Sequence, residues 1–193
     1  MRYEKQEQPT LPTGSYSISL ATGTMAAGLA AASEVFQFLW TSTTSFAVIE
    51  EIRFDGAGGI AAFTPGFWKM AAFIARAWTV AGTGGTAATI TTNNAKLQTR
   101  FGTTLLGEAR IATTAALTAG TKTLDAQPIG SCMGGVTATA GFSLPQGQIY
   151  QGYGTTPPIV LAANEGIAIQ VTVPATGTWT GGYTIRWDER AGF

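Results

Sequence analysis

Apolar and polar residues alternate in short segments from Gly14 onward, and a period of two predicts β-strands. The segments are rich in β-branched and aromatic residues, and clusters of Gly, Thr, Asn and Pro separate them. The first three, at 15–20, 34–40 and 46–54, contain these apolar positions: Tyr16, Ile18 and Leu20; Val35, Phe36, Phe38 and Trp40; Phe46, Val48, Ile52 and Phe54. We predict a strand for each segment.

Residues 67–80, FWKMAAFIARAWTV, are ambiguous, because Ala, Met and Lys favour a helix while the aromatic residues favour a strand. An alternating apolar set favours the strand: Trp68, Met70, Ala72, Ile74 and Trp78. We predict a strand, with an embedded helix as the alternative. Residues 24–33, TMAAGLAAAS, predict either a short helical turn or a loop packed against the sheet.

Further along the chain, residues 82–94 read as a flexible Gly/Thr/Asn loop. Alternation returns over 96–111, where Leu97, Phe101, Leu105 and Ile111 are the residues expected to be buried.

The clearest pattern lies near the C-terminus, over Gly166 to Trp187. Two strictly alternating runs flank the loop 174–177, PATG: Ile167, Ile169, Val171 and Val173 before it, and Tyr183, Ile185 and Trp187 after it. Two strands around a Pro/Gly loop predict a β-hairpin, and Gly181-Gly182 predicts a bulge within it.

Several short strands at this spacing indicate an all-β fold, a β-sandwich that is expected to be jelly-roll-like. The length of 193 residues suits one domain, for which we expect residues 14–193. Residues 1–13 are polar and contain prolines, so we expect an extended N-terminal arm, either disordered or bound along a neighbour.

Composition adds an expectation about assembly. Charged residues make up 11% of the chain, which contains 31 alanines, 31 threonines and 25 glycines. Soluble domains typically contain about 25% charged residues. An uncharged surface of small residues is suited to being covered by neighbours, which indicates an oligomer; the alternative is an Ala/Thr-biased soluble monomer.

Charge and hydropathy argue against several partners. Lys plus Arg equals Asp plus Glu at 11 each, so no basic footprint for a nucleic acid is visible. The N-terminus has no apolar stretch typical of a signal peptide, and no apolar run is long enough for a membrane span. The single Cys132 excludes an intrachain disulfide.

The chain contains no histidine, which removes Ser-His and Cys-His nucleophiles and His-ligated metals. Among the carboxylates, Glu50 and Glu51 are expected on opposite faces of a strand, whereas Glu51 and Asp55 share one. Asp188 and Glu189 read as a soluble strand end with Arg186 and Arg190 as partners. We therefore predict a non-enzymatic protein with no catalytic residue, no metal site and no cofactor.

Aromatic side chains are the remaining candidates for binding, namely Trp68, Trp78, Tyr150, Tyr153 and Trp179. They suit a sugar-stacking platform, but alternating aromatics more often fill a sandwich core or a subunit contact. We favour the core, with Tyr150 and Tyr153 as the exposed exceptions.

Several strings resemble a group of proteins encoded in structural-gene regions of tailed bacteriophages and prophages. They are SYSISLATGTMAAGLAAA at 15–32, GGTAAT at 84–89, TLDAQP at 123–128, LAANEG at 161–166 and PATGTW at 174–179. None is a catalytic motif. The resemblance implies a virion component assembled in the bacterial host cytoplasm, such as a capsid decoration (cement) protein with a jelly-roll body. The expected partners are copies of itself, which we expect to form a trimer, and the major capsid protein. The alternative function is that of a tail- or fibre-associated carbohydrate-binding module.

Overall fold

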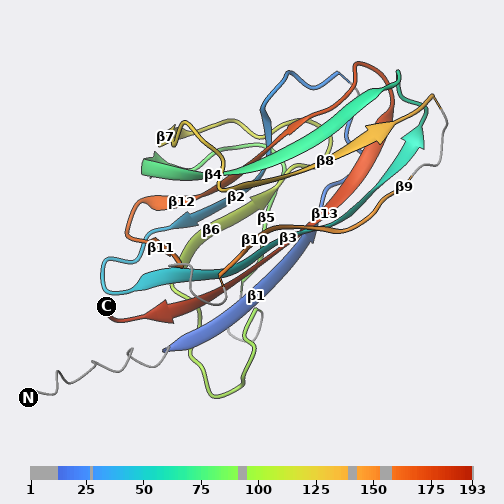
Figure 1. Ribbon diagram of the computed structural model, residues 1–193. Helices are drawn as coiled ribbons and strands as arrows, with labels where there is room; N and C mark the ends of the chain where they lie inside the picture. Colours follow the sequence, from blue (N-terminus) through green and yellow to red (C-terminus); the bar gives the residue numbers. More distant parts are fainter. Residues whose placement is uncertain (1–12, 27, 91–94, 139–142, 153–157, 193) are drawn as a thin grey trace, which may run out of the picture.

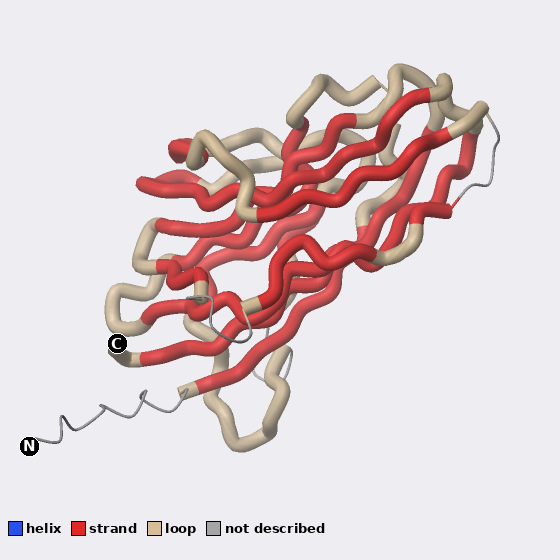
Figure 2. Tube along the Cα trace, in the orientation of Figure 1, coloured by secondary structure: helices blue, strands red, loops and turns tan. Residues whose placement is uncertain are grey.

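The computed structural model describes residues 13–26, 28–90, 95–138, 143–152 and 158–192. Within these ranges every regular element is a β-strand (Figure 2). The strands are β1 Gly14–Ala21, β2 Ser33–Trp40, β3 Phe46–Ala61, β4 Gly66–Val80, β5 Thr86–Ala87, β6 Leu106–Ile111, β7 Thr121–Leu124, β8 Gly130–Val136, β9 Ser143–Leu144, β10 Gly147–Gln151, β11 Ile159–Leu161, β12 Glu165–Thr172 and β13 Thr178–Arg190. The predicted all-β class is confirmed. Residues 1–12 of the expected arm lie outside the described residues.

Two antiparallel sheets pack face to face as a β-sandwich (Figure 1). The first sheet has the order β1-β13-β3-β10, and β9 and β11 pair with other parts of the long strand β3. The second has the order β5-β6-β2-β12-β4-β7, and β8 pairs with β4. Strands close in sequence therefore pair mostly with strands far along the chain.

The core between the sheets follows from the predicted alternation. Along β13, the side chains of Trp179, Tyr183, Ile185 and Trp187 are completely buried. Trp187 stacks on Tyr16 of β1 at 5.4 Å between ring centroids and meets the edge of Phe38 of β2 at 5.0 Å. Aromatic pairs of this kind join the two sheets and add to the free energy of simple burial.

Strand β4 confirms the prediction of a strand at 67–80. Trp68, Met70 and Ala72 face the core between the sheets, as their alternation requires. The pairing of β4 with β7 shifts register between Arg76 and Val80, and Ala77 has a φ of 49°. This irregularity turns Trp78 to the outer face of the second sheet, where it packs with Leu39 and Ala75.

The predicted C-terminal hairpin is wrong. Strand β12 pairs with β2 and β4 in the second sheet, whereas β13 pairs with β1 and β3 in the first. The loop after Val173 therefore crosses from one sheet to the other. The bulge expected at Gly181-Gly182 is confirmed by a register shift between Gly182 and Tyr183.

Two of the four side chains expected to be buried over 96–111 are exposed. Phe101 and Ile111 are buried, but Leu97 and Leu105 are 50% and 48% exposed. Both leucines lie in a connection that precedes β6, where alternation has no meaning because the backbone is not a strand. Of residues 24–33, the described part of 24–32 forms a loop and Ser33 begins β2; Met25 bridges Trp179.

Candidate interaction surface

The tryptophans considered for sugar stacking lie inside the molecule. Trp68 and Trp78 are each 1% exposed and Trp179 is fully buried. A stacking platform needs open ring faces, so these three side chains do not form one. Tyr150 is partly buried and its hydroxyl accepts a hydrogen bond from the Ile159 amide at 3.0 Å. Tyr153 lies outside the described residues.

Glu51 and Asp55 share the outer face of the first sheet, as expected, and Arg53 lies between them. The Arg53 guanidinium is 2.7 Å from Asp55 Oδ1 and 3.6 Å from Glu51 Oε1. Asp55 Oδ2 also accepts a hydrogen bond from the Thr184 hydroxyl at 2.6 Å. The two carboxylates thus belong to a network of ion pairs and hydrogen bonds on one strand face.

Glu50 departs from the predicted alternation. Arg186 pairs with Glu51 and Trp187 with Ile49, so Glu50 is the extra residue of a bulge in β3. Glu50 lines a polar cleft together with Arg186, while Glu51 is 3.6 Å from the same guanidinium. The expectation of opposite faces is therefore wrong. Burial raises the pKa of Glu50, the Asp188 carboxylate raises it further, and Arg190 lowers it.

Glu189 is also misplaced by the sequence prediction, which put it at a soluble strand end. It is 3% exposed. Its Oε1 atom accepts hydrogen bonds from the Thr104 hydroxyl at 2.5 Å and from the Leu105 amide at 2.9 Å. The carboxylate therefore anchors the connection before β6. Asp188 does meet the expected Arg190, at 3.8 Å.

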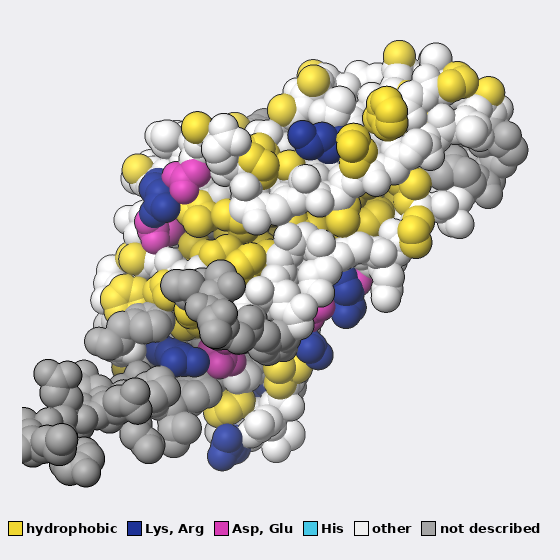
Figure 3. Space-filling view, in the orientation of Figure 1, with side chains coloured by type: hydrophobic (Ala, Val, Ile, Leu, Met, Phe, Trp, Pro, Cys, Tyr) yellow, Lys and Arg dark blue, Asp and Glu magenta, His cyan; other side chains and the backbone are white. Residues whose placement is uncertain are grey.

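The most exposed large apolar side chains lie together on the outer face of the second sheet. Phe67 of β4 is 72% exposed and Met133 of β8 is 68% exposed. Phe67 pairs with Gly135, and Met133 pairs with Lys69, so the two side chains are diagonal neighbours on that face. Hydrophobic side chains gather in this part of the molecule and along the seam between the two layers (Figure 3).

Strand β8 itself is an unprotected edge. It pairs with β4 and has no strand partner on its other side among the described residues. Its sequence, GSCMGGV, contains neither a charge nor a proline. Natural sheets usually protect such edges with Lys, Pro or very short strands, because a free edge templates pairing with another chain.

Three other edge strands in the described part of the chain have such protection. The edge of β1 is covered by the segment near Lys96: the Ser17 amide donates to Ala95 O at 2.7 Å, and the Leu97 amide donates to Ser15 O at 2.9 Å. Strand β5 is two residues long and β7 is four. Strand β10, at an edge of the first sheet, also lacks charge and proline, but it has five residues where β8 has seven.

A cavity of about 140 Å³ opens beside β8, between the edges of the two sheets. Phe54, Trp68, Met133 and Leu144 line it. We call strand β8, Phe67 and this cavity the β8 surface. Sequence reasoning missed it, although the absence of charge and proline over 130–136 was a usable signal.

Comparison with known proteins adds no relative: no family model, no curated protein and no solved structure matches the chain. In the described ranges, no group of three or more Cys, Asp and Glu side chains is arranged to hold a metal ion. The same ranges contain no helix that is long and apolar enough to cross a membrane.

Proposed function

We propose that this protein is a non-enzymatic structural subunit that functions by assembling with copies of itself and with other subunits of a particle. The β8 surface is the observation that supports it. Strand β8 is a seven-residue edge strand without charge, and Met133 within it and Phe67 beside it are strongly exposed. Covering this surface with another chain removes apolar side chains from water and pairs the free backbone groups of the edge.

We propose that the particle is a bacteriophage virion. Within it, the chain would be a capsid decoration protein that contacts the major capsid protein. The resemblance of the sequence to phage structural-region proteins supports this choice. The winding of the chain is consistent with a jelly-roll body, since β1, β2, β3 and β4 alternate between the two sheets, as do β12 and β13.

Light scattering coupled to size-exclusion chromatography tests the assembly. The wild-type protein is expected to form an oligomer whose mass rises with concentration. Met133→Lys places a charge on the β8 surface and is expected to raise the dissociation constant at least about tenfold, equivalent to ~1.4 kcal/mol.

Leu97→Lys is the matched control, because it makes the same kind of change at a 50% exposed leucine outside the β8 surface. It is expected to assemble like the wild type. A wild-type protein that stays monomeric at every concentration, or equal weakening by both substitutions, contradicts assembly through β8.

A further inference from the structure

Three polar side chains are buried together on the outer face of the second sheet. Glu34 and Gln37 come from β2 and Lys122 comes from β7. The side chains of Glu34 and Lys122 are 6% and 2% exposed, and Gln37 is 2% exposed. A bulge in β2, where Phe36 pairs with Ile169 but Glu34 with Gln170, places Glu34 and Gln37 on the same face.

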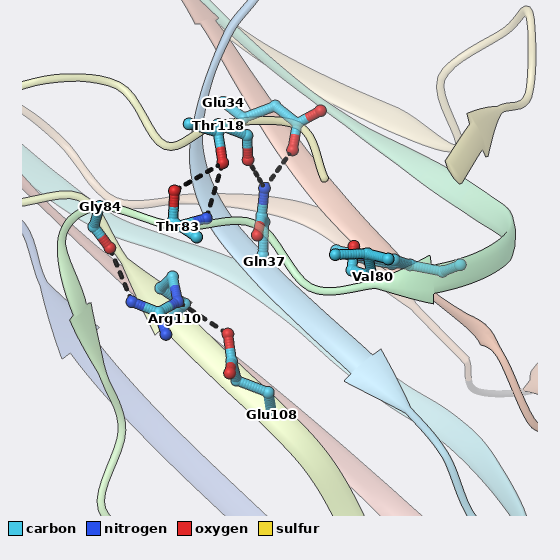
Figure 4. Close-up of polar contacts among 9 residues, drawn as sticks. Glu34, Gln37, Val80, Thr83, Gly84, Glu108, Arg110 and Thr118 are labelled. Atoms are coloured by element: carbon cyan, nitrogen blue, oxygen red, sulfur yellow. Dashed lines mark hydrogen bonds and ion pairs between the residues drawn. The ribbon is translucent and has the colours of Figure 1, made fainter. Parts of the chain in front are cut away.

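One carboxylate oxygen joins the other two groups. Glu34 Oε2 accepts a hydrogen bond from Lys122 Nζ at 2.8 Å and another from Gln37 Nε2 at 2.6 Å. Gln37 Nε2 also donates to Thr118 O at 2.8 Å, so the amide is held from two sides (Figure 4). Lys122 Nζ also donates to the carbonyl oxygen of Ala119. The amine and the amide are therefore held beside one potential proton carrier.

An aromatic ring covers the lysine of this cluster. The ring of Trp78 covers Lys122 Nζ at 4.3 Å from its centroid, and Trp78 packs with Leu39 and Ala75. In surroundings of low polarity two separated charges are costly. The contact of 2.8 Å between Lys122 Nζ and Glu34 Oε2 offers a direct path along which the ammonium can pass a proton to the carboxylate.

Packing alone does not explain why the cluster is polar. Gln37 Oε1 is buried and has no hydrogen-bond partner among the described residues. A buried polar network with an unsatisfied member is less stable than apolar side chains of the same size. The arrangement is better explained as a reactive site, because polar groups are retained in a protein interior where chemistry needs them.

We propose that Lys122 and Gln37 form an intramolecular isopeptide bond, with Glu34 as the proton carrier. The neutral Nζ of Lys122 attacks Cδ of Gln37, which is bonded to the Nε2 atom that Glu34 holds. A bond forms between Nζ and Cδ, and the bond between Cδ and Nε2 breaks. Glu34 accepts a proton from Nζ and delivers one to Nε2, which leaves as ammonia. The exchange replaces one amide by another and needs neither an oxidant nor a reductant.

The bond would connect β2, inside the second sheet, with β7 at its edge. A covalent link between residues so far apart in sequence restricts the unfolded chain. It would strengthen a particle subunit, but the inference rests on the buried cluster and not on the proposed assembly.

Mass spectrometry of the purified, intact protein tests the bond without any variant. The expected mass is lower than that of the sequence by one ammonia molecule. Fragmentation of a proteolytic digest is expected to yield a branched peptide that joins Gln37 to Lys122. An intact mass equal to that of the sequence overturns the proposal, whatever the oligomeric state.

Three substitutions distinguish the loss of ammonia caused by this bond from a loss of ammonia elsewhere in the chain. Lys122→Arg removes the nucleophile and Glu34→Gln removes the proton carrier, so both proteins are expected to retain the full mass of their sequences. Lys69→Arg, at an exposed lysine on the same face of the second sheet, is expected to show the same loss as the wild type. A loss of ammonia that persists in Lys122→Arg also overturns the proposal.

Discussion

At the scale of single residues, the end of the core near β1 depends on a buried tyrosine. Tyr16 is 2% exposed, stacks on Trp187, and donates a hydrogen bond from its hydroxyl to Gly102 O at 3.1 Å. Burial raises the pKa of Tyr16 from 10.0 to about 12, and the carboxylate of Glu189 contributes to the rise. The folded protein thus holds this phenol in its neutral form more strongly than the unfolded chain does.

This difference predicts a loss of stability in alkaline solution. Below pH 10 the phenol is neutral in both states and its contribution to folding is complete. As the pH rises from 10.0 through about 12, the unfolded chain releases the proton first, so the free energy of unfolding falls. Urea unfolding over this range measures the effect. Tyr16→Phe is expected to flatten the fall, and an unchanged slope would contradict the assignment to Tyr16.

At the scale of the elements, bulges decide which face a side chain occupies. The extra residue in β3 brings Glu50 beside Arg186, and the irregularity in β4 turns Trp78 away from the core between the sheets. Each bulge changes the parity of every residue beyond it. The outer face of the second sheet therefore has its own small buried cluster.

Strand β12 has to approach that cluster closely, and Gly166 permits it. A Cβ atom at Gly166 would lie 2.2 Å from Phe38 O and 2.8 Å from the ring of Trp78. Gly166→Ala is therefore expected to lower the free energy of unfolding by about 1–3 kcal/mol, the usual cost of overpacking. Chemical denaturation measures it.

Gly135→Ala in β8 is the matched control, because a Cβ atom there has no neighbour within 4 Å. Its effect is expected to stay within about 0.5 kcal/mol. Equal destabilisation by the two substitutions would show that the loss of glycine, and not the contact at Gly166, is responsible.

At the scale of the whole molecule, charged residues are unevenly distributed. Ion pairs lie on the outer faces of both sheets, such as Arg53 with Glu51 and Asp55 on the first and Arg110 with Glu108 on the second. The free edge of the second sheet, β8, has no charged residue. Assembly through β8 would thus depend on apolar contact and backbone pairing and little on ion pairs.

This predicts that self-association is insensitive to salt. The dissociation constant measured by analytical ultracentrifugation is expected to change by less than about threefold between low and high ionic strength, because salt mainly screens exposed charges. A steep weakening at high salt would instead place a charged face in the contact.

Much of the fold could be predicted from the sequence, because alternation of apolar residues is a local property of a strand. It predicted the strand at 67–80 against the helical propensity of its alanines, and it identified Tyr16, Ile18 and Trp187 as core residues. The absence of histidine likewise limits the available chemistry by composition alone, because it removes a common general base and metal ligand.

Pairing partners and faces could not be predicted, because both depend on parts of the chain far away in sequence. The runs at 167–173 and 183–187 read as a hairpin, but only packing of the two sheets decides that β12 and β13 lie in different layers. The irregularities in β3 and β4 were not predicted, which is why Glu50 and Trp78 were misplaced. The free edge of β8 and the cluster of Glu34, Gln37 and Lys122 exist only once distant strands have been brought side by side.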